Sequence, residues 1–228
     1  MLRPLSVGMR AIAHFKSATA RMVSLWIIPK TSEKTILNMR KLKYYVACTV
    51  DGFIAREDGS FDCFPMSGEH FADLFDSFPE TFPAHFQEAR GIRAENKQFD
   101  AVLMGRKTYE VGLNVGVTNP YPSLKQYVFS RTMKASPDEN IELVSDNPVA
   151  VVKELKKETG KDIWLCGGGA LAATLFSEID EMIVKLNPVV IGSGIPLFSR
   201  AVDPTNLELA DRKIYTNGFM LLHYRVKH

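Results

Sequence analysis

Apolar and polar residues alternate along residues 41–50, and this period of two predicts a strand with one buried face. Short apolar runs bounded by turn-forming residues predict five further strands, at residues 100–104, 126–129, 141–144, 163–166 and 182–186. Near the end of the chain, residues 207–215 and 219–226 flank Thr216-Asn217-Gly218, a sequence typical of a β-hairpin turn.

Segments with helical spacing lie between these strands. Residues 69–78 predict a helix with Ser67 as its N-cap, and a second helix is expected over residues 84–95. Asn147 followed by Pro148 is a clear start signal, because Asn caps free N–H groups and Pro suits the first helical position. Residues 170–176 are helix formers with an apolar face.

Strands that alternate with helices predict an α/β fold in three layers, αβα. Its central sheet is expected to be mostly parallel, covered by helices on both faces, with an antiparallel C-terminal hairpin. Neither a repeat nor a low-complexity linker interrupts residues 39–228, so we expect them to form one domain.

Residues 1–38 differ in charge from the rest of the chain. They carry six basic residues against one acidic residue, a net charge of +5, whereas the remainder carries 22 basic and 25 acidic residues, a net charge of −3. Such a segment has the composition of an organelle transit peptide. Alternatively, the true start is Met39, directly before the first strand. Under either interpretation, residues 1–38 are an N-terminal extension that we expect to be disordered or loosely packed.

Composition narrows the function classes. The near-neutral charge of residues 39–228 argues against a nucleic-acid surface, and the apolar stretch at residues 22–28 is too short to cross a membrane. The chain has three cysteines and no CxxC pair, which argues against a disulfide framework and against a zinc site. We therefore expect no metal, and a reducing compartment such as the cytoplasm, or an organelle if residues 1–38 are a transit peptide.

Residues that could bind a ligand come directly after four of the predicted strands. Ligands of open α/β sheets gather at the carboxyl ends of strands, where this chain places Asp51-Gly52, Gly105 to Thr108, Ser130-Arg131 and Gly167 to Gly169. The glycine triplet begins a helix, where bare N–H groups favour an anion, although a tight turn without a ligand is the alternative. Arg, Ser and Thr at the neighbouring ends suit a dinucleotide with an additional 2′-phosphate. A Rossmann domain is rejected because its glycines would follow the first strand.

Five ordered motifs resemble the dihydrofolate reductase-like family, in particular the branch that shares its fold with the reductase domain of bacterial riboflavin biosynthesis proteins. The motifs are Thr49-Val-Asp-Gly-Phe-Ile-Ala55, Leu103-Met-Gly-Arg-Lys-Thr-Tyr-Glu110, Tyr127-Val-Phe-Ser-Arg131, Leu165-Cys-Gly-Gly-Gly169 and Pro188-Val-Val-Ile-Gly-Ser-Gly-Ile-Pro-Leu-Phe198. The resemblance covers residues 39–228. It implies an NADPH-dependent oxidoreductase that reduces a pterin-like, pyrimidine or ribosylamino-pyrimidine substrate.

 

That resemblance also implies roles for individual residues. Gly105, Arg106 and Thr108 would hold phosphate and ribose, and Ser130 with Arg131 would bind the 2′-phosphate. The diphosphate would rest on the backbone of Gly167, Gly168, Gly169, Ala170 and Leu171. Ala47 and Ile54 would flank the nicotinamide, and the family leads us to expect a homodimer.

The acid that completes a reduction is less apparent in the sequence. Asp51 is the first candidate for proton donor, because it follows the strand that opens onto the expected nicotinamide, while a turn aspartate before Gly52 is the alternative. Folate reductases carry Leu-Pro-Trp where this chain has Cys63-Phe64-Pro65-Met66, and they carry a pterin-facing acid that has no clear match here. A dinucleotide-binding protein without turnover is therefore the second hypothesis.

Overall fold

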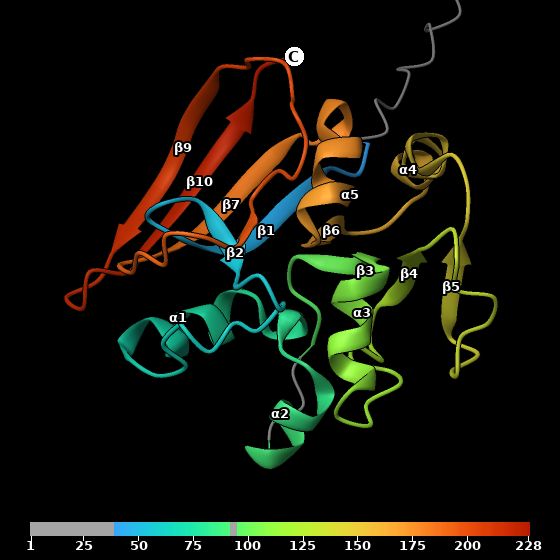
Figure 1. Ribbon diagram of the computed structural model, residues 1–228, viewed down its shortest axis with the longest axis horizontal. Coiled ribbons are helices and arrows are strands. Elements are labelled where there is room, and N and C mark those ends of the chain that lie inside the picture. Colours follow the sequence, from blue (N-terminus) through green and yellow to red (C-terminus); the bar gives the residue numbers. More distant parts are fainter. Residues whose placement is uncertain (1–38, 92–94) are drawn as a thin grey trace, which may run out of the picture. The chain divides into compact units, whose positions relative to one another are not determined.

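The computed structural model of the protein describes residues 39–91 and 95–228. The expected N-terminal extension, residues 1–38, lies outside the described residues. Eight strands form the main sheet: β1 (Leu42–Thr49), β3 (Phe99–Gly105), β4 (Lys125–Phe129), β5 (Ile141–Val144), β6 (Asp162–Gly167), β7 (Glu181–Asn187), β9 (Leu207–Ile214) and β10 (Met220–Val226). Their order across the sheet is β5-β4-β3-β6-β1-β7-β10-β9 (Figure 1).

Strand direction divides this sheet into two parts. The six strands from β5 to β7 are parallel to one another. β10 is antiparallel to both β7 and β9, so the C-terminal hairpin forms one side of the sheet. The predicted α/β fold, with a mostly parallel sheet and an antiparallel hairpin at its end, is confirmed.

Helices pack on both faces of the sheet: α1 (Glu69–Ser77), α2 (Ala84–Ala89), α3 (Arg106–Leu113), α4 (Pro148–Lys157) and α5 (Gly169–Thr174), with 3₁₀ turns η1 (Pro79–Thr81) and η2 (Phe176–Glu178). On one face, Leu155 of α4 and Leu171 of α5 pack in a cluster with Tyr44 and Val46 of β1. On the other face, Leu74 of α1 and Tyr109 of α3 pack in a cluster with Tyr45 of β1. The alternation of β1 therefore supplies both cores, because successive side chains point to opposite faces.

Of the helix boundaries predicted from local sequence, one is confirmed and two differ from the structure. Asn147 caps α4, since its side-chain oxygen accepts a hydrogen bond from the Ala150 N–H at 3.2 Å. The expected cap at Ser67 is wrong, because Gly68 occupies the N-cap of α1 and no side chain caps that helix. The helix expected over residues 84–95 ends at Ala89, where the chain turns through Gly91 at φ +66°.

A second, two-stranded sheet was not predicted. β2 (Phe53–Ala55) pairs with β8 (Ile195–Pro196) in antiparallel orientation. Just beyond β8, the Leu197 N–H donates to the Gly52 carbonyl oxygen at 2.9 Å, and the Ser199 N–H donates to the Gly169 carbonyl oxygen at 3.0 Å. The segment at residues 195–199 thus links the loop after β1 to the start of α5.

Candidate active site

The carboxyl ends of the parallel strands bring the four predicted segments to one edge of the sheet. Gly105, the last residue of β3, is in register with Phe129, so Ser130 and Arg131 follow directly beside it. On the other side of β3, the register with β6 shifts at Cys166, which puts Gly167 opposite Met104. The four segments, far apart in the chain, therefore lie on neighbouring strands.

Two helices begin side by side at this edge. The N-cap of α3 is Gly105 and the N-cap of α5 is Gly168, and no side chain caps either helix. A Cβ placed on Gly168 would lie 3.5 Å from Thr108 Oγ1, and a Cβ placed on Gly105 would lie 3.8 Å from the Gly167 carbonyl oxygen. First-turn N–H groups without side-chain acceptors, reinforced by two helix dipoles, suit a bound diphosphate.

Glycine is required at two positions of this turn for different reasons. Gly168 has φ +93°, in the left-handed region that residues with a Cβ rarely adopt. At Gly169 a Cβ would collide with the Pro196 carbonyl oxygen at the end of β8 and with Ser199 in the loop that follows. The first glycine shapes the turn, and the second lets the loop after β8 approach α5.

Side chains with charge or hydroxyl groups lie beside these helix starts. Arg106 Nη1 contacts Glu110 Oε1 at 2.8 Å one helical turn further on. Ser130 Oγ accepts hydrogen bonds from the Met133 N–H at 2.9 Å and the Thr132 N–H at 3.2 Å, so it orders the turn that carries Arg131. Arg131 is exposed and forms no ion pair with any residue in the described ranges. Its guanidinium is free to bind an anion.

Asp51 lies in an exposed turn after β1. Its carboxylate accepts hydrogen bonds from the Gly192 N–H at 2.7 Å and from the Ile191 N–H at 3.2 Å. Hydrogen bonds from the Thr49 hydroxyl and then from these backbone groups lower the pKa of Asp51 below its usual value. These contacts anchor the loop after β7, and the proton-donor role of Asp51 stays a prediction.

On the face of the sheet that carries α1, side chains become more exposed toward the same edge. The cross-strand neighbours Tyr45 and Ile183 are buried. Two residues further along β1, Ala47 and the next row of cross-strand neighbours, Lys185 and Leu221, are only half-buried. Ala47, expected beside the nicotinamide, is the one β1 residue in Leu42–Thr49 that is not fully buried. Ile54, its expected companion, packs against the cluster on the opposite face.

Lys185 was missed by the sequence analysis. Its Nζ lies 4.0 Å from the centroid of the Tyr45 ring, and burial lowers the pKa of Lys185 to about 8, with the nearby Cys166 thiol opposing that shift. The signal was present in the sequence, because Lys185 is the charged residue inside the otherwise apolar run at residues 182–186.

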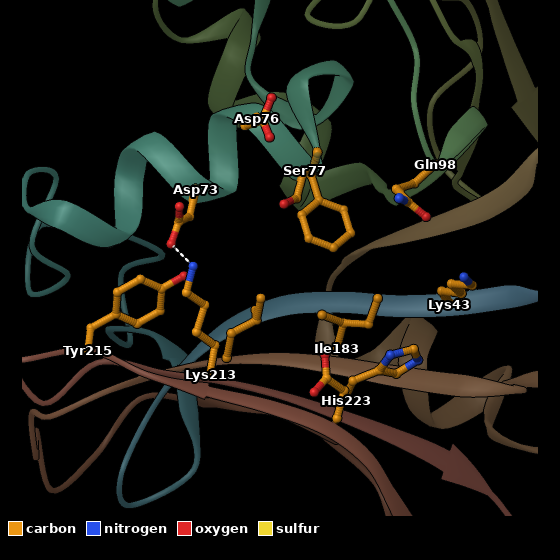
Figure 2. A pocket seen from close by; sticks show the side chains of 12 residues that line it. Lys43, Asp73, Asp76, Ser77, Gln98, Ile183, Lys213, Tyr215 and His223 are labelled. Carbon is orange, nitrogen blue, oxygen red and sulfur yellow. Dashed lines mark hydrogen bonds and ion pairs between the residues drawn. The ribbon is translucent and has the colours of Figure 1, made fainter.

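A pocket of about 440 Å³ lies on the α1 face of the sheet, lined by residues of β1, β7, α1 and the C-terminal hairpin (Figure 2). Its lining includes Lys43, Ile183 and His223, with Asp73 and Lys213 paired across it. None of the predicted cofactor residues line this pocket. Leu221, which also lines it, is the cross-strand neighbour of Lys185, so the pocket extends to the half-buried residues described above.

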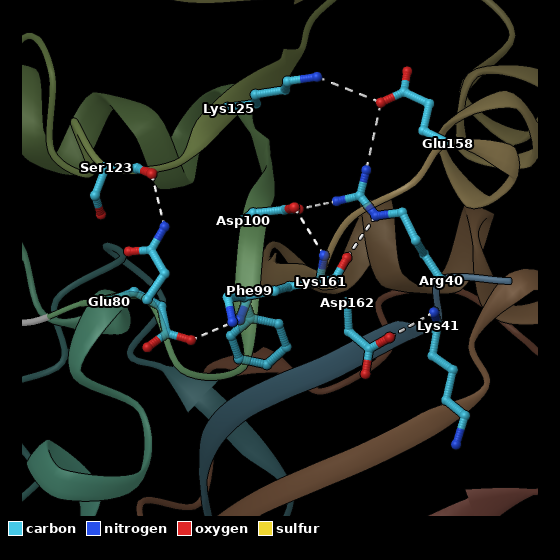
Figure 3. A network of polar contacts seen from close by, with 11 residues as sticks. Arg40, Lys41, Glu80, Phe99, Asp100, Ser123, Lys125, Glu158, Lys161 and Asp162 are labelled. Atoms are coloured by element: carbon cyan, nitrogen blue, oxygen red, sulfur yellow. Dashed lines mark hydrogen bonds and ion pairs between the residues drawn. The ribbon is translucent and has the colours of Figure 1, made fainter. Parts of the chain in front are cut away.

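Ion pairs and charged hydrogen bonds fill the amino edge of the sheet (Figure 3). Arg40, only 3% exposed, pairs with Asp100 and donates to the Lys161 carbonyl oxygen at 2.6 Å. Glu80, 1% exposed, accepts hydrogen bonds from the Gln98 and Phe99 N–H groups, each at 2.6 Å. Buried charge at this edge is thus matched by a partner of opposite charge or by backbone donors.

Within residues 39–91 and 95–228, no helix has the length and apolar character that a membrane crossing requires. The same ranges contain no group of three or more His, Cys, Asp or Glu side chains placed to bind a metal ion.

The chain is similar to known proteins over most of its length. The model of the RibD C-terminal domain family matches residues 40–221. The chain is 33% identical over 187 residues to the protein YwjB of Bacillus subtilis (strain 168), covering 81% of this chain and 97% of YwjB.

Solved structures show the same fold. A putative riboflavin biosynthesis protein from Shewanella sp. PV-4 superposes with a TM-score of 0.62 at 22% identity, covering 82% of this chain and 99% of that protein. A diaminohydroxyphosphoribosylaminopyrimidine deaminase/5-amino-6-(5-phosphoribosylamino)uracil reductase from Thermotoga maritima superposes with a TM-score of 0.56 at 15% identity, covering 83% of this chain and 57% of that protein.

Proposed function

The chain belongs to the RibD C-terminal domain family, and from that premise we propose that it is a reductase that uses NADPH. Its substrate is a pterin-like, pyrimidine or ribosylamino-pyrimidine compound. The observation that carries this proposal is the pair of helix starts, at Gly105 and Gly168, that lie side by side without side-chain caps. When bound, NADPH supplies a hydride to the carbon that is reduced.

The residues at the carboxyl edge fit the phosphates of this cofactor. The backbone from Gly167 to Leu171, together with Gly105 and Thr108, would hold the diphosphate and ribose. Arg106 would reach a phosphate by exchanging its contact with Glu110. Ser130 and Arg131, which has no ion pair among the described residues, would bind the 2′-phosphate, since an Arg fork and a hydroxyl donor match its oxygens. Ala47 and Ile54 would border the nicotinamide.

Substitution of Arg131 tests the cofactor assignment. Arg131→Ala should weaken NADPH binding by about 10-fold or more, because a charge-assisted contact to the 2′-phosphate is lost, and should leave NADH binding nearly unchanged. Isothermal titration calorimetry with both dinucleotides measures the two affinities. Arg212→Ala is the matched control, since Arg212 is also exposed but lies on β9. Equal losses for NADPH and NADH would contradict the assignment.

Turnover separates an enzyme from a binding protein. The wild-type protein should oxidise NADPH when mixed with one of a panel of dihydropterins, aminopyrimidines and 5-amino-6-(5-phosphoribosylamino)uracil, followed at the absorbance of the reduced nicotinamide. NADPH binding without turnover on any of these compounds would favour the second hypothesis, a dinucleotide-binding protein. Absence of NADPH binding would contradict both.

We further propose that the protein is a homodimer in a reducing compartment such as the cytoplasm. β9 is exposed along its length, and its Leu207, Leu209 and Ile214 are 41%, 42% and 60% exposed, which is the kind of strand that a second copy would cover. Cys48, Cys63 and Cys166 are all free thiols, as a reducing compartment requires. Light scattering after size-exclusion chromatography tests the dimer.

A further inference from the structure

We propose that Lys185 is a catalytic residue of this reductase, whose ammonium group donates a proton to the substrate heteroatom beside the carbon that is reduced. The inference rests on the proposed function and assigns the acid that this function needs.

Lys185 differs from the other lysines that are not exposed. Three lysines in the described ranges, Lys43, Lys156 and Lys185, are buried or half-buried. Lys43 Nζ pairs with Asp162 at 2.8 Å and with Glu181 at 3.2 Å, and Lys156 Nζ pairs with Asp180 at 2.7 Å. Within residues 39–91 and 95–228, Lys185 has neither an ion pair nor a side-chain hydrogen bond. An unmatched cation at such a position costs stability, which suggests a use in function.

The position of Lys185 fits that use. It lies in register with Ala47 on β1 and with Leu221 on β10, in the half-buried row near the carboxyl edge. Its Nζ lies 4.0 Å from the centroid of the Tyr45 ring, and this contact holds the ammonium group on the α1 face. Lys185 is therefore the cross-strand neighbour of Ala47, the residue expected beside the nicotinamide.

The groups that face Lys185 leave its charge unneutralised. Tyr45 from β1 and Cys166 from β6 are titratable neighbours, and β10 contributes the apolar Leu221. Beyond Leu221, Lys213 of β9 is paired with Asp73 of α1. Burial raises the pKa of Cys166 to about 11 and raises the pKa of Tyr45 further above its usual value, so both are neutral near pH 7. Burial lowers the pKa of Lys185 to about 8, which makes it an acid that can both give and regain a proton near neutral pH.

The proton balance of the step is simple. The π electrons of the substrate C=N or C=O bond move to the heteroatom, which forms a bond to hydrogen as one Nζ–H bond of Lys185 breaks. The hydride and its two electrons come from the reduced dinucleotide of the proposed function. Lys185 is left as a neutral amine and regains its proton from water. Asp51 is less suited to this step because its lowered pKa keeps the carboxylate ionised.

Two variants separate proton donation from charge. Lys185→Met should lower kcat by about 100-fold or more, the usual contribution of a general acid, and remove the fall in rate above pH 8. Lys185→Arg keeps the positive charge but cannot release a proton, so it should remain slow. Lys161→Met, at an exposed lysine on the amino edge, is the control and should match the wild type. The substrate is the panel member that the wild-type protein turns over.

Two readouts do not depend on turnover. Calorimetry should show NADPH binding in Lys185→Met within about threefold of the wild type. Acetylation with acetic anhydride between pH 6 and 10, read by mass spectrometry, should show half-maximal reactivity of Lys185 near pH 8. Wild-type rates in Lys185→Met or Lys185→Arg would overturn the donor role alone. Wild-type protein that fails to bind NADPH, or to turn over any panel member, would overturn the proposed function and this inference with it.

Discussion

The two edges of the parallel sheet handle polar groups in opposite ways. At the amino edge, buried Arg40 meets Asp100, and buried Glu80 meets backbone N–H groups. At the carboxyl edge, α3 and α5 begin without side-chain caps, and Arg131 and Lys185 have no carboxylate partner in the described ranges. The amino edge therefore holds the strands together, and the carboxyl edge keeps its donors available for a ligand.

In such a sheet, function is expected where polar groups lack a partner within the fold. A matched buried charge contributes to the fold, and removal of one partner leaves the other uncompensated. An unmatched donor contributes little to the fold but can bind or protonate a ligand. Substitutions at the amino edge should therefore change mainly stability, and those at the carboxyl edge should change mainly cofactor affinity or turnover.

The largest effect is expected at Arg40. Arg40→Ala should lower the free energy of unfolding by about 1.5–3 kcal/mol, because the half-buried carboxylate of Asp100 loses its charge-assisted hydrogen bond. Urea denaturation measures this loss. The NADPH affinity of the folded variant should stay at the wild-type value, and Arg212→Ala, at an exposed position, should shift stability by no more than about 0.5 kcal/mol. Weaker NADPH binding by folded Arg40→Ala would contradict the division of roles between the two edges.

The next effect is a dependence of stability on pH. Burial tends to raise the pKa of Glu181, but hydrogen bonds from His223 and Lys41 and the charge of Lys43 outweigh burial and hold that pKa well below the unfolded value of 4.5. The unfolded chain therefore binds the proton first, so this contribution is present above about pH 5 and is lost as the pH falls.

Glu181→Gln should remove that dependence. The wild-type stability should fall with a slope of up to about 1.4 kcal/mol per pH unit below pH 4.5 from this group, and the variant should show a shallower slope in urea titrations from pH 6 to 3. Glu208→Gln is the control, because the exposed Glu208 pairs with Arg225 and Lys227 where solvent screens the charges. Parallel acid profiles for the wild type and Glu181→Gln would contradict the role of Glu181.

The smallest effect on stability is expected at Gly168. Gly168→Ala forces a Cβ into a backbone with φ +93° and should cost about 1 kcal/mol, while NADPH affinity should fall by about 10-fold. Gly116→Ala is the matched control, since Gly116 has φ +78° and open space around it. Calorimetry should show a loss of affinity only at Gly168. Equal affinities in the two variants would remove Gly168 from the cofactor site.

The sequence predicted local features better than long-range ones. The cap at Asn147 and the hairpin around Asn217 depend on neighbouring residues, and both are confirmed. The cap at Ser67 failed because the start of α1 is set by packing: Leu74 and His70 are buried, and Gly68 at φ +131° precedes the helix. The β2–β8 pair was missed since its short strands are 140 residues apart and have no periodic pattern.

The candidate site was predictable only in part. The glycines and hydroxyls that follow strands are visible in the sequence, and the parallel order of β4, β3 and β6 brings them together. Lys185 could not be recognised in the same way, because a lysine in a strand is usually exposed or paired. Its character depends on register with Ala47 and on the absence of a carboxylate nearby in the described residues, which are properties of the folded chain.

The central place of β1 in the sheet has a consequence for synthesis of the protein. β1 pairs with β6 and β7, and its first contact, Leu42 with Ile163, joins residues separated by 121 positions in the chain. A ribosome therefore has to add more than half of the chain before β1 can form its first strand pair. Until β7 emerges, an apolar strand stays without its partners, which is when such a chain depends most on chaperones.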